Sequence, residues 1–167
     1  ELDFEQSLRS RVALLAGLDE RVLAEVYENV LRLSPGAEFL LDECKAHGVK
    51  FMLVSGGFTF FTERLQQRLG FKYQHANVLE IENGKLTGRL KGRIIDAQAK
   101  ADLLREYRDR LGLQPHQVLA MGDGANDIPM LKEAGIGVAY RAKPKAQAVA
   151  DACINFGGLE RVRDWFK

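Results

Sequence analysis

The sequence lacks the features that define several classes of protein. Among its 167 residues there are only two cysteines, Cys44 and Cys153, and no C-x-x-C pair, so neither a disulfide framework nor a structural zinc site is indicated. No apolar run reaches the roughly 18 residues of a membrane span, and the first residues do not resemble a signal peptide. We therefore expect a cytoplasmic protein that does not bind a membrane.

The sequence also lacks an excess of charge of one sign. It contains 24 Lys and Arg residues and 23 Asp and Glu residues, a formal net charge of +1. This balance produces no field that would attract nucleic acid. Because 46% of the residues are hydrophobic, the chain can bury the core of one ordinary domain, and we expect its partner to be a small molecule.

The first part of the chain has a helical pattern. Apolar residues recur at helical spacing from Asp3 to Arg32 and predict two helices that form a hairpin, with Asp19 as a cap. Ser34-Pro35-Gly36 interrupts the pattern before a third helix at about residues 37–46. The predicted parts are a helical appendage, residues 1–33, and an α/β core, residues 34–167.

The core alternates between short apolar runs and helical patterns, which predicts an α/β fold with a parallel sheet. Asn83-Gly84 favours a tight hairpin turn, because both residues accept positive φ. The predicted strands span residues 49–54, 78–81, 86–90, 118–121 and 136–140, and the predicted helices span residues 58–69, 96–111 and 127–134.

The segment Gly122-Asp123-Gly124-Ala125-Asn126-Asp127 lies between a predicted strand and a predicted helix. Ligands of open α/β sheets bind at this carboxyl end of the strands. Carboxylate oxygens suit Mg²⁺, so the segment predicts an acidic metal site. A dinucleotide-binding loop and a plain turn are the alternatives, although Asp127 replaces the third glycine of G-x-G-x-x-G.

A second candidate segment is Ser55-Gly56-Gly57, which separates a predicted strand from a predicted helix. Its hydroxyl and N–H groups, at the positive end of a helix dipole, predict an anion cradle suited to phosphate. The alternative is a serine that only caps the helix. Lys100 would add a cation, so that the cradle, the acidic loop and the lysine together match the needs of phosphoryl transfer.

Other polar residues are expected to be exposed or structural. The three histidines have no spacing that suits a shared site, and the basic residues are expected on a solvated surface. These residues are His47, His75, His116, Arg105, Arg108, Arg110, Arg141, Lys143 and Lys145.

Several segments resemble one known family in the same order along the chain. They are Asp3–Val12, Val54–Phe61, Asp96–Lys100, the G-D-G-x-N-D segment and Ala142–Lys145. Together they resemble the phosphoserine phosphatases of the haloacid dehalogenase superfamily, over essentially the whole chain. The resemblance implies a Rossmann-like parallel-sheet core with a small helical cap and a β-hairpin. It also implies hydrolysis of phospho-L-serine to L-serine and phosphate, the last step of serine biosynthesis, through a phosphoaspartyl intermediate.

The resemblance further implies roles for individual residues. Asp123 would ligate Mg²⁺, and Asp127 would support the metal shell. Ser55, Gly56 and Lys100 would hold the phosphate, with Lys100 and Asp127 as members of the catalytic set.

Three further residues would recognise the rest of the substrate. Arg11 would pair with the substrate carboxylate, Phe4 would close over the substrate from the cap, and Asn126 would contact it. A guanidinium suits a carboxylate because its planar fork donates two parallel hydrogen bonds. The alternative for Arg11 is a surface arginine on an amphipathic helix.

The sequence departs from the family in one respect. Family members attack phosphorus with the first Asp of a D-x-D motif, and no D-x-D occurs in the 167 residues. We therefore expect the nucleophile and the central strand to lie in a missing N-terminal segment of the same protein, and this chain alone to be inactive. The alternatives are phosphoryl transfer to another small alcohol, and a catalytically inert module that binds Mg²⁺ and anions.

Overall fold

The computed structural model describes residues 3–165, so the parts of the predictions that concern residues 1–2 and 166–167 lie outside the described residues. The chain divides into two compact units, and one of the boundaries between them falls within helix α3 (Ala37–Ala46). Unit 1 comprises Glu1–Leu33 and Cys44–Ile95, and unit 2 comprises Ser34–Glu43 and Asp96–Lys167. The predicted cap and core, residues 1–33 and 34–167, describe a different division and stay a prediction.

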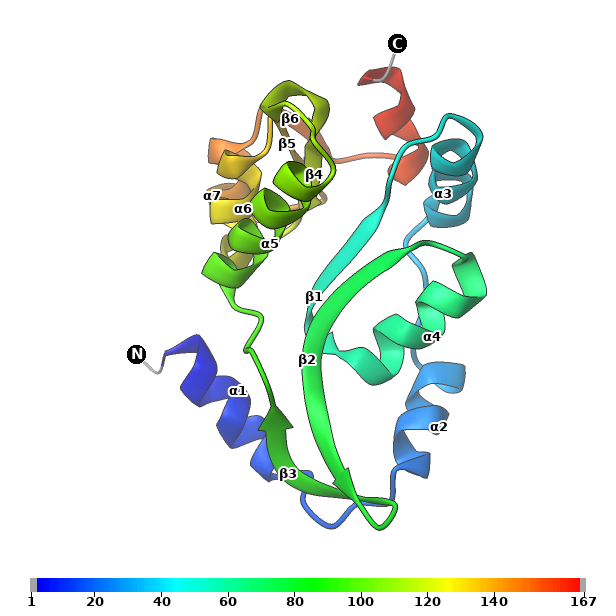
Figure 1. Ribbon diagram of the computed structural model, residues 1–167, viewed down its shortest axis with the longest axis vertical. Coiled ribbons are helices and arrows are strands. Elements are labelled where there is room, and N and C mark those ends of the chain that lie inside the picture. The colour runs from blue at the N-terminus through cyan, green and yellow to red at the C-terminus, as the bar shows by residue number, and fades with distance from the viewer. Residues whose placement is uncertain (1–2, 166–167) are drawn as a thin grey trace. The chain divides into compact units, whose positions relative to one another are not determined.

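Unit 1 is built on a three-stranded sheet with the order β1-β2-β3. Strand β1 (Met52–Phe58) is parallel to β2 (Tyr73–Glu82), and β2 is antiparallel to β3 (Lys85–Lys91), as Figure 1 shows. Asn83 (φ 52°) and Gly84 (φ 74°) form the turn between β2 and β3. The predicted hairpin is therefore confirmed, because only residues that tolerate positive φ can form this two-residue connection.

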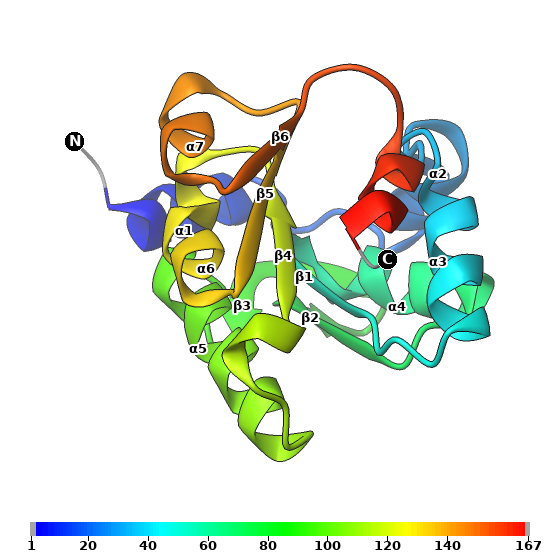
Figure 2. The same ribbon diagram turned by 90° about the horizontal axis from the view of Figure 1, so that it is seen from above.

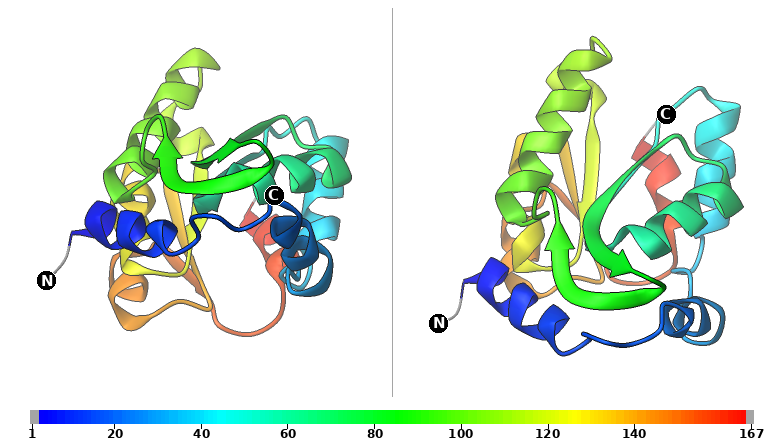
Figure 3. Two further views of the ribbon diagram at one scale, coloured as in Figure 1. Left: turned by 90° about the horizontal axis from the view of Figure 1, so that it is seen from below. Right: turned by 60° about the horizontal axis from the view of Figure 1, so that its bottom comes forward.

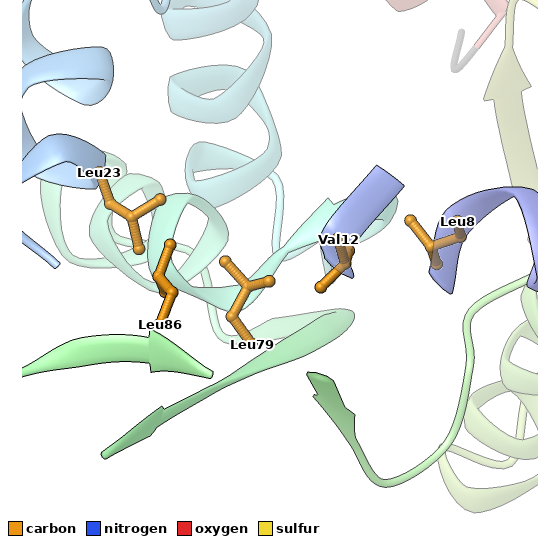
Figure 4. Packing of buried hydrophobic residues seen from close by; sticks show 5 residues of the cluster. All are labelled: Leu8, Val12, Leu23, Leu79 and Leu86. Atoms are coloured by element: carbon orange, nitrogen blue, oxygen red, sulfur yellow. The ribbon is translucent and has the colours of Figure 1, made fainter. Parts of the chain in front are cut away.

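Three helices pack on this sheet. Helix α1 (Phe4–Ala13) lies along β3 (Figure 3, right), and α4 (Thr59–Leu69) packs on β1 and β2. Figure 4 shows Leu79 of β2 between side chains from α1 and from α2 (Arg21–Asn29). The two predicted helices are confirmed, but the predicted helical hairpin is wrong, because α1 packs on β3 and α2 packs Leu23, its one buried residue, into the same cluster. The buried cluster consists of Leu8, Val12, Leu23, Leu79 and Leu86.

Helix α2 begins close to the predicted cap. The carboxylate of Asp19 accepts a hydrogen bond from the backbone N–H of Arg21, the first residue of α2, at 2.9 Å. It also accepts hydrogen bonds from the Arg21 guanidinium, which lower the pKa of Asp19 to about 2. Asp19 therefore satisfies one of the N–H groups that a helix start leaves unpaired.

Strand β1 corrects the sequence analysis at a functionally important place. The strand begins at Met52 and continues through Ser55-Gly56-Gly57 to Phe58, so the prediction that this segment separates the strand from the helix is wrong. The pairing with β2 is irregular there. Three residues, Ser55–Gly57, lie between the paired residues Val54 and Phe58 of β1, whereas only one residue lies between their partners in β2, His75 and Asn77. The additional residues bulge out of the ladder, and α4 begins directly after the strand.

Unit 2 contains a parallel sheet with the order β4-β5-β6. The strands are β4 (Leu119–Gly122), β5 (Ile136–Tyr140) and β6 (Ala152–Ile154), and the helices are α5 (Ala97–Arg110), α6 (Ile128–Glu133) and α7 (Pro144–Val149). Figure 2 shows α6 and α7 beside the sheet, and α5 packs on α6. Single 3₁₀ turns occupy Pro115–Gln117, Ala125–Asp127 and Leu159–Trp165.

The α/β fold with parallel strands is confirmed. Asp96 caps α5, because its carboxylate accepts a hydrogen bond from the N–H of Ala99 at 2.8 Å. Within residues 3–165, β1 and β4 are each an edge strand of their own sheet. None of the helices in this described part of the chain has the length and apolar character needed to cross a membrane.

Candidate functional site

Both oxygens of the Asp127 carboxylate accept hydrogen bonds, three in all. Its Oδ1 accepts a hydrogen bond from Nζ of Lys100 at 2.7 Å. Its Oδ2 accepts hydrogen bonds from the backbone N–H groups of Asp123 and Gly124, at 3.0 and 3.3 Å. Both side chains of the ion pair are 7% exposed. Asp127 therefore fixes the loop after β4 and compensates the charge of a buried lysine.

Asp123 differs from Asp127, because it is exposed and its carboxylate makes no hydrogen bond or ion pair within residues 3–165. It follows β4 directly, and its backbone carbonyl accepts a hydrogen bond from the N–H of Lys143 at 3.0 Å. The backbone of Asp123 is thus held while its carboxylate stays available. A hard oxygen donor of this kind suits Mg²⁺, which takes one or two protein carboxylates and completes its shell with water and substrate oxygens.

The other carboxylate of the loop is less suited to bind a metal directly, because both oxygens of Asp127 already accept hydrogen bonds. Within the described residues, no group of three or more His, Cys, Asp or Glu side chains could hold a metal ion. The residues present fit a site in which Asp123 is the ligand and Asp127 holds the loop in place. The roles that the resemblance implies for Asp123 and Asp127 stay predictions.

Gly122 is required for the approach of Asp127 to the strand end. A Cβ atom at Gly122 would lie 2.5 Å from Cβ of Asp127 and 2.6 Å from its Cγ. Any side chain at position 122 would therefore displace Asp127. Asn126 is half-buried, and its Oδ1 would lie 3.0 Å from a Cβ at Gly124. The first glycine of the segment makes room for Asp127, and the second lies next to the amide of Asn126.

In unit 1, the Ser55 hydroxyl turns back onto its own segment. Its Oγ accepts a hydrogen bond from the N–H of Gly57 at 2.9 Å. The N-cap residue of α4 is Phe58, so the interpretation of Ser55 as a helix cap is wrong. The predicted cradle at the helix start also needs correction, because Ser55–Gly57 belong to the strand and the N–H of Gly57 is already bonded. Ser55 and Gly56 stay candidates for phosphate binding.

Phe4 lies next to this segment within unit 1. A Cβ atom at Gly56 would lie 3.6 Å from Cζ of Phe4, so the ring tip faces the side of Gly56 on which a side chain would stand. Phe4 also packs against the buried cluster of Leu8 and its neighbours. The structure therefore brings together Phe4 and Gly56, which the sequence analysis assigns to the same substrate.

Arg11 lies on the same side of α1 as Phe4, nearly two turns and about 10 Å further along the axis. It is exposed, and its Nε donates a hydrogen bond to the carbonyl of Ser7 at 3.4 Å. The terminal nitrogens make no hydrogen bond within residues 3–165. By contrast, the guanidinium of Arg9 is bonded to Glu5 at 2.8 Å. Arg11 is therefore the arginine of α1 that can bind a carboxylate of a ligand.

Two arginines of α5 bond to the same glutamate, and Arg105 is exposed as predicted, whereas Arg108 is not the solvated residue that the sequence predicts. Arg105 and Arg108 both bond to Glu133 of α6, at 3.1 and 3.2 Å, and Arg108 is only 15% exposed. The hydrogen bond from Arg105, together with both positive charges, lowers the pKa of Glu133. Arg141 also has a partner, because it donates a hydrogen bond to the carbonyl of Gly157 at 2.7 Å. These arginines join segments that are distant in sequence.

Asn77 is a polar residue that the sequence analysis missed. It is 0% exposed and lies in β2. Its Nδ2 donates a hydrogen bond to the carbonyl of Gly56 at 3.0 Å, and its Oδ1 accepts one from the N–H of Ile95 at 2.8 Å. The sequence contains no clear signal for this residue, because β2 has other polar residues, such as Gln74 and Glu80, and only burial shows that the Asn77 amide requires partners.

The comparison with protein families places these motifs in a known group. Residues 1–132 match the haloacid dehalogenase-like hydrolases. The chain belongs to the haloacid dehalogenase-like hydrolase family. This match covers well over half of the chain and includes the loop with Asp123 and Asp127. The resemblance expected from the sequence is therefore confirmed, and the chain is a hydrolase of this family.

Similar members of the haloacid dehalogenase-like hydrolase family include phosphoserine phosphatases of two bacteria. The chain is 50% identical to the phosphoserine phosphatase of Polaromonas sp. over 169 residues, which is 99% of this chain and 72% of that protein. It is 47% identical to that of Albidiferax ferrireducens, again over 169 residues, 99% of this chain and 71% of the relative. These relatives confirm the predicted resemblance to phosphoserine phosphatases.

A solved structure of the family supports the fold. The chain has a TM-score of 0.94 with an unliganded probable phosphoserine phosphatase from Vibrio cholerae, at 45% sequence identity. The match covers 98% of this chain and 50% of that structure's chain. The present sequence therefore corresponds to about half of that longer polypeptide.

Proposed function

We propose that this protein is a Mg²⁺-dependent phosphatase that hydrolyses phospho-L-serine to L-serine and inorganic phosphate. The names of its relatives support the substrate, and the chemistry of the loop after β4 supports the reaction class. A phosphoserine carries a phosphate and a carboxylate, so it requires groups that bind two different anions. The described residues offer candidates for both.

The observation that carries the proposal is the unequal use of two neighbouring carboxylates. Asp127 uses both oxygens, for Lys100 and for two backbone N–H groups, while the exposed carboxylate of Asp123 has no partner within residues 3–165. One carboxylate thus holds the loop, and the other is free to bind a cation. When bound, Mg²⁺ would neutralise phosphate charge and act as a Lewis acid.

The proposal assigns the phosphate to Ser55, Gly56 and Lys100. A serine hydroxyl and a backbone N–H donate hydrogen bonds to phosphate oxygens, and an ammonium group adds charge-assisted bonds. Asn126 can donate a hydrogen bond through its side-chain amide. Lys100 and Asp127 belong to the catalytic set because they would set the charge around the reacting phosphate.

Recognition of the rest of the substrate is assigned to α1. The Arg11 guanidinium would bind the substrate carboxylate through two parallel hydrogen bonds. Phe4 would cover the substrate with an apolar ring and exclude water from it. The exposed, unbonded end of Arg11 and the position of the Phe4 ring, 3.6 Å from where a Cβ of Gly56 would lie, support these assignments.

The attacking group is assigned outside these 167 residues, because they contain no D-x-D. In the proposed reaction, a carboxylate oxygen of the first D-x-D aspartate bonds to phosphorus as the bond from phosphorus to the serine oxygen breaks. The second aspartate gives a proton to the leaving oxygen. Water then hydrolyses the phosphoaspartate and releases phosphate. The expected place in serine biosynthesis and in the cytoplasm belongs to the same proposal.

The absence of D-x-D also favours a second candidate function for the chain by itself, a module that binds Mg²⁺ and anions without turnover. Calorimetry with phosphoserine separates the two, since a module of this kind binds the ligand and releases no phosphate. Phosphoryl transfer to another small alcohol is tested by adding acceptor alcohols. A transferase would form a new phosphate ester, whereas a hydrolase releases inorganic phosphate regardless.

The decisive experiment is Asp123→Asn in the full-length protein that carries this sequence. We expect Mg²⁺-dependent phosphate release from phosphoserine to be abolished and Mg²⁺ binding in calorimetry to be lost, because an amide oxygen is a much weaker ligand than a carboxylate. The control is Asp109→Asn, which removes an exposed carboxylate at the end of α5. Undiminished activity of the Asp123 variant would refute the proposal.

A further inference from the structure

Asn77 connects two backbone segments of unit 1 through a single buried side chain. Its amide donates to the carbonyl of Gly56 in β1 and accepts from the N–H of Ile95, the last residue of the unit. The partners determine how the amide is oriented, because a carbonyl can only accept and an N–H can only donate. Both ends of the side chain are therefore used, and Asn77 is 0% exposed.

The hydrogen bond to Gly56 replaces one that the sheet does not make. Val54 pairs with His75 and Phe58 pairs with Asn77, so the segment Ser55–Gly57 lies where the ladder between β1 and β2 is interrupted. A buried carbonyl without a partner costs about 1–3 kcal/mol. The Asn77 amide satisfies the Gly56 carbonyl and so stabilises the bulged shape of this segment. Gly57 is held separately, by the hydroxyl of Ser55.

We propose that Asn77 is a positioning residue for phosphate binding, which holds the backbone of Gly56 so that the Ser55–Gly57 segment has the shape that receives the phosphoryl group. The inference rests on the proposed function, since it takes Ser55 and Gly56 as phosphate ligands. Asn77 acts through the backbone of Gly56 and is not itself assigned to the substrate. If Asn77 only stabilised the core, its substitution would lower the stability of the protein and leave the phosphate affinity of the folded protein unchanged.

The test compares Asn77→Asp with Thr62→Val. Aspartate has the shape of asparagine and can accept from Ile95, but its carboxylate has no hydrogen to donate to Gly56. Thr62 is the matched control, because it is also buried in unit 1 and donates a hydrogen bond to Gln74 at 2.6 Å, away from Ser55–Gly57. Calorimetry with inorganic phosphate measures affinity, NMR measures the amide shifts of Gly56 and Gly57, and thermal unfolding measures stability.

We expect Asn77→Asp to weaken phosphate binding about tenfold, the equivalent of about 1.4 kcal/mol, and to shift the Gly56 and Gly57 amide signals. Thr62→Val should lower the unfolding temperature without either effect. Equal phosphate affinity of the two variants would overturn the inference while leaving the proposed function intact. If the wild-type protein neither binds phosphate nor hydrolyses phosphoserine, the proposed function fails, and the inference fails with it.

A second variant keeps the inference testable if Asn77→Asp does not fold. Asn77→Ser retains a hydroxyl donor on a shorter side chain, so it creates no buried charge. We expect it to weaken phosphate binding and to shift the same two glycine signals. Wild-type phosphate affinity in a folded Asn77→Ser protein would overturn the inference.

Discussion

Nζ of Lys100 and Oδ1 of Asp127 lie 2.7 Å apart, in a pair whose side chains are each 7% exposed. The two residues are 27 positions apart in sequence, on α5 and in the loop after β4. Each charge is compensated by the other, because both are largely removed from water. The loss of either partner would therefore leave the other charge buried without compensation in unit 2.

Removing only the lysine should be strongly destabilising. We expect Lys100→Met to lower the free energy of unfolding by about 3–5 kcal/mol, because it leaves the Asp127 carboxylate buried without its cation. Urea unfolding measures the change. The exposed Lys132 on α6 is the control, and Lys132→Met should have little effect. The double variant Lys100→Met/Asp127→Asn should lose less free energy of unfolding than the sum of the losses in the two single variants. An additive result would contradict the coupling of the two residues.

A side chain at Gly122 should damage the metal site. Gly122→Ala places a Cβ within 2.6 Å of the Asp127 side chain, so Asp127 and its loop must move. We expect about a tenfold or greater loss of Mg²⁺ affinity in calorimetry, the range found when groups that orient metal ligands are disturbed. Gly112→Ala is the control, because a Cβ at Gly112 would meet nothing within 4 Å, so that any effect comes only from its positive φ (+66°). An unchanged Mg²⁺ affinity in Gly122→Ala would show that Asp127 does not position the ligand.

Arg11 should favour phosphate esters that carry a carboxylate over those that do not. We expect Arg11→Ala to raise KM for phosphoserine about tenfold or more, from the loss of a charge-assisted hydrogen bond of about 1.5–3 kcal/mol. KM for a simple alkyl phosphate should change little, because that ester has no carboxylate. The matched control is Arg9→Ala, whose guanidinium is bonded to Glu5. Equal effects on both substrates would remove Arg11 from carboxylate recognition.

Glu133 should make the free energy of unfolding depend on pH, with less stability at low pH. Its pKa is lowered from 4.5 by the hydrogen bond from Arg105 and by the charge of Arg108. The stabilisation is therefore complete above the unfolded pKa near 4.5 and is lost as the pH falls through the lower folded pKa. We expect Glu133→Gln to cost about 1 kcal/mol or less at pH 7, and this difference to vanish with acidification in denaturant titrations. Glu63→Gln, at an exposed residue of α4, is the control. A difference that persists at the lowest pH would contradict the ion-pair explanation.

Much of the fold follows from local chemistry that can be recognised in the sequence. Asn83-Gly84 forms the predicted turn because two adjacent residues accept positive φ. The α5 cap at Asp96 and the bounds of α3 and β5 follow from a few neighbouring residues. The acidic loop was also identifiable, because its residues are consecutive and follow an apolar strand.

The errors arose where one segment needs another to define its conformation. Ser55-Gly56-Gly57 has the composition of a turn, but Val54 before it and Phe58 after it both pair with β2, and the segment continues the strand as a bulge. The helices α1 and α2 have the apolar pattern of a hairpin, which does not indicate that each packs on the β-hairpin instead.

The sequence by itself therefore determined the family, the α/β class and the residue types of the site. Only the tertiary structure decided which carboxylate is bonded and which is free, and that Asn77 supports Gly56. The physical reason is that turns and caps depend on neighbouring residues, whereas the pairing of Lys100 with Asp127 depends on burial and hydrogen bonds between segments distant in sequence.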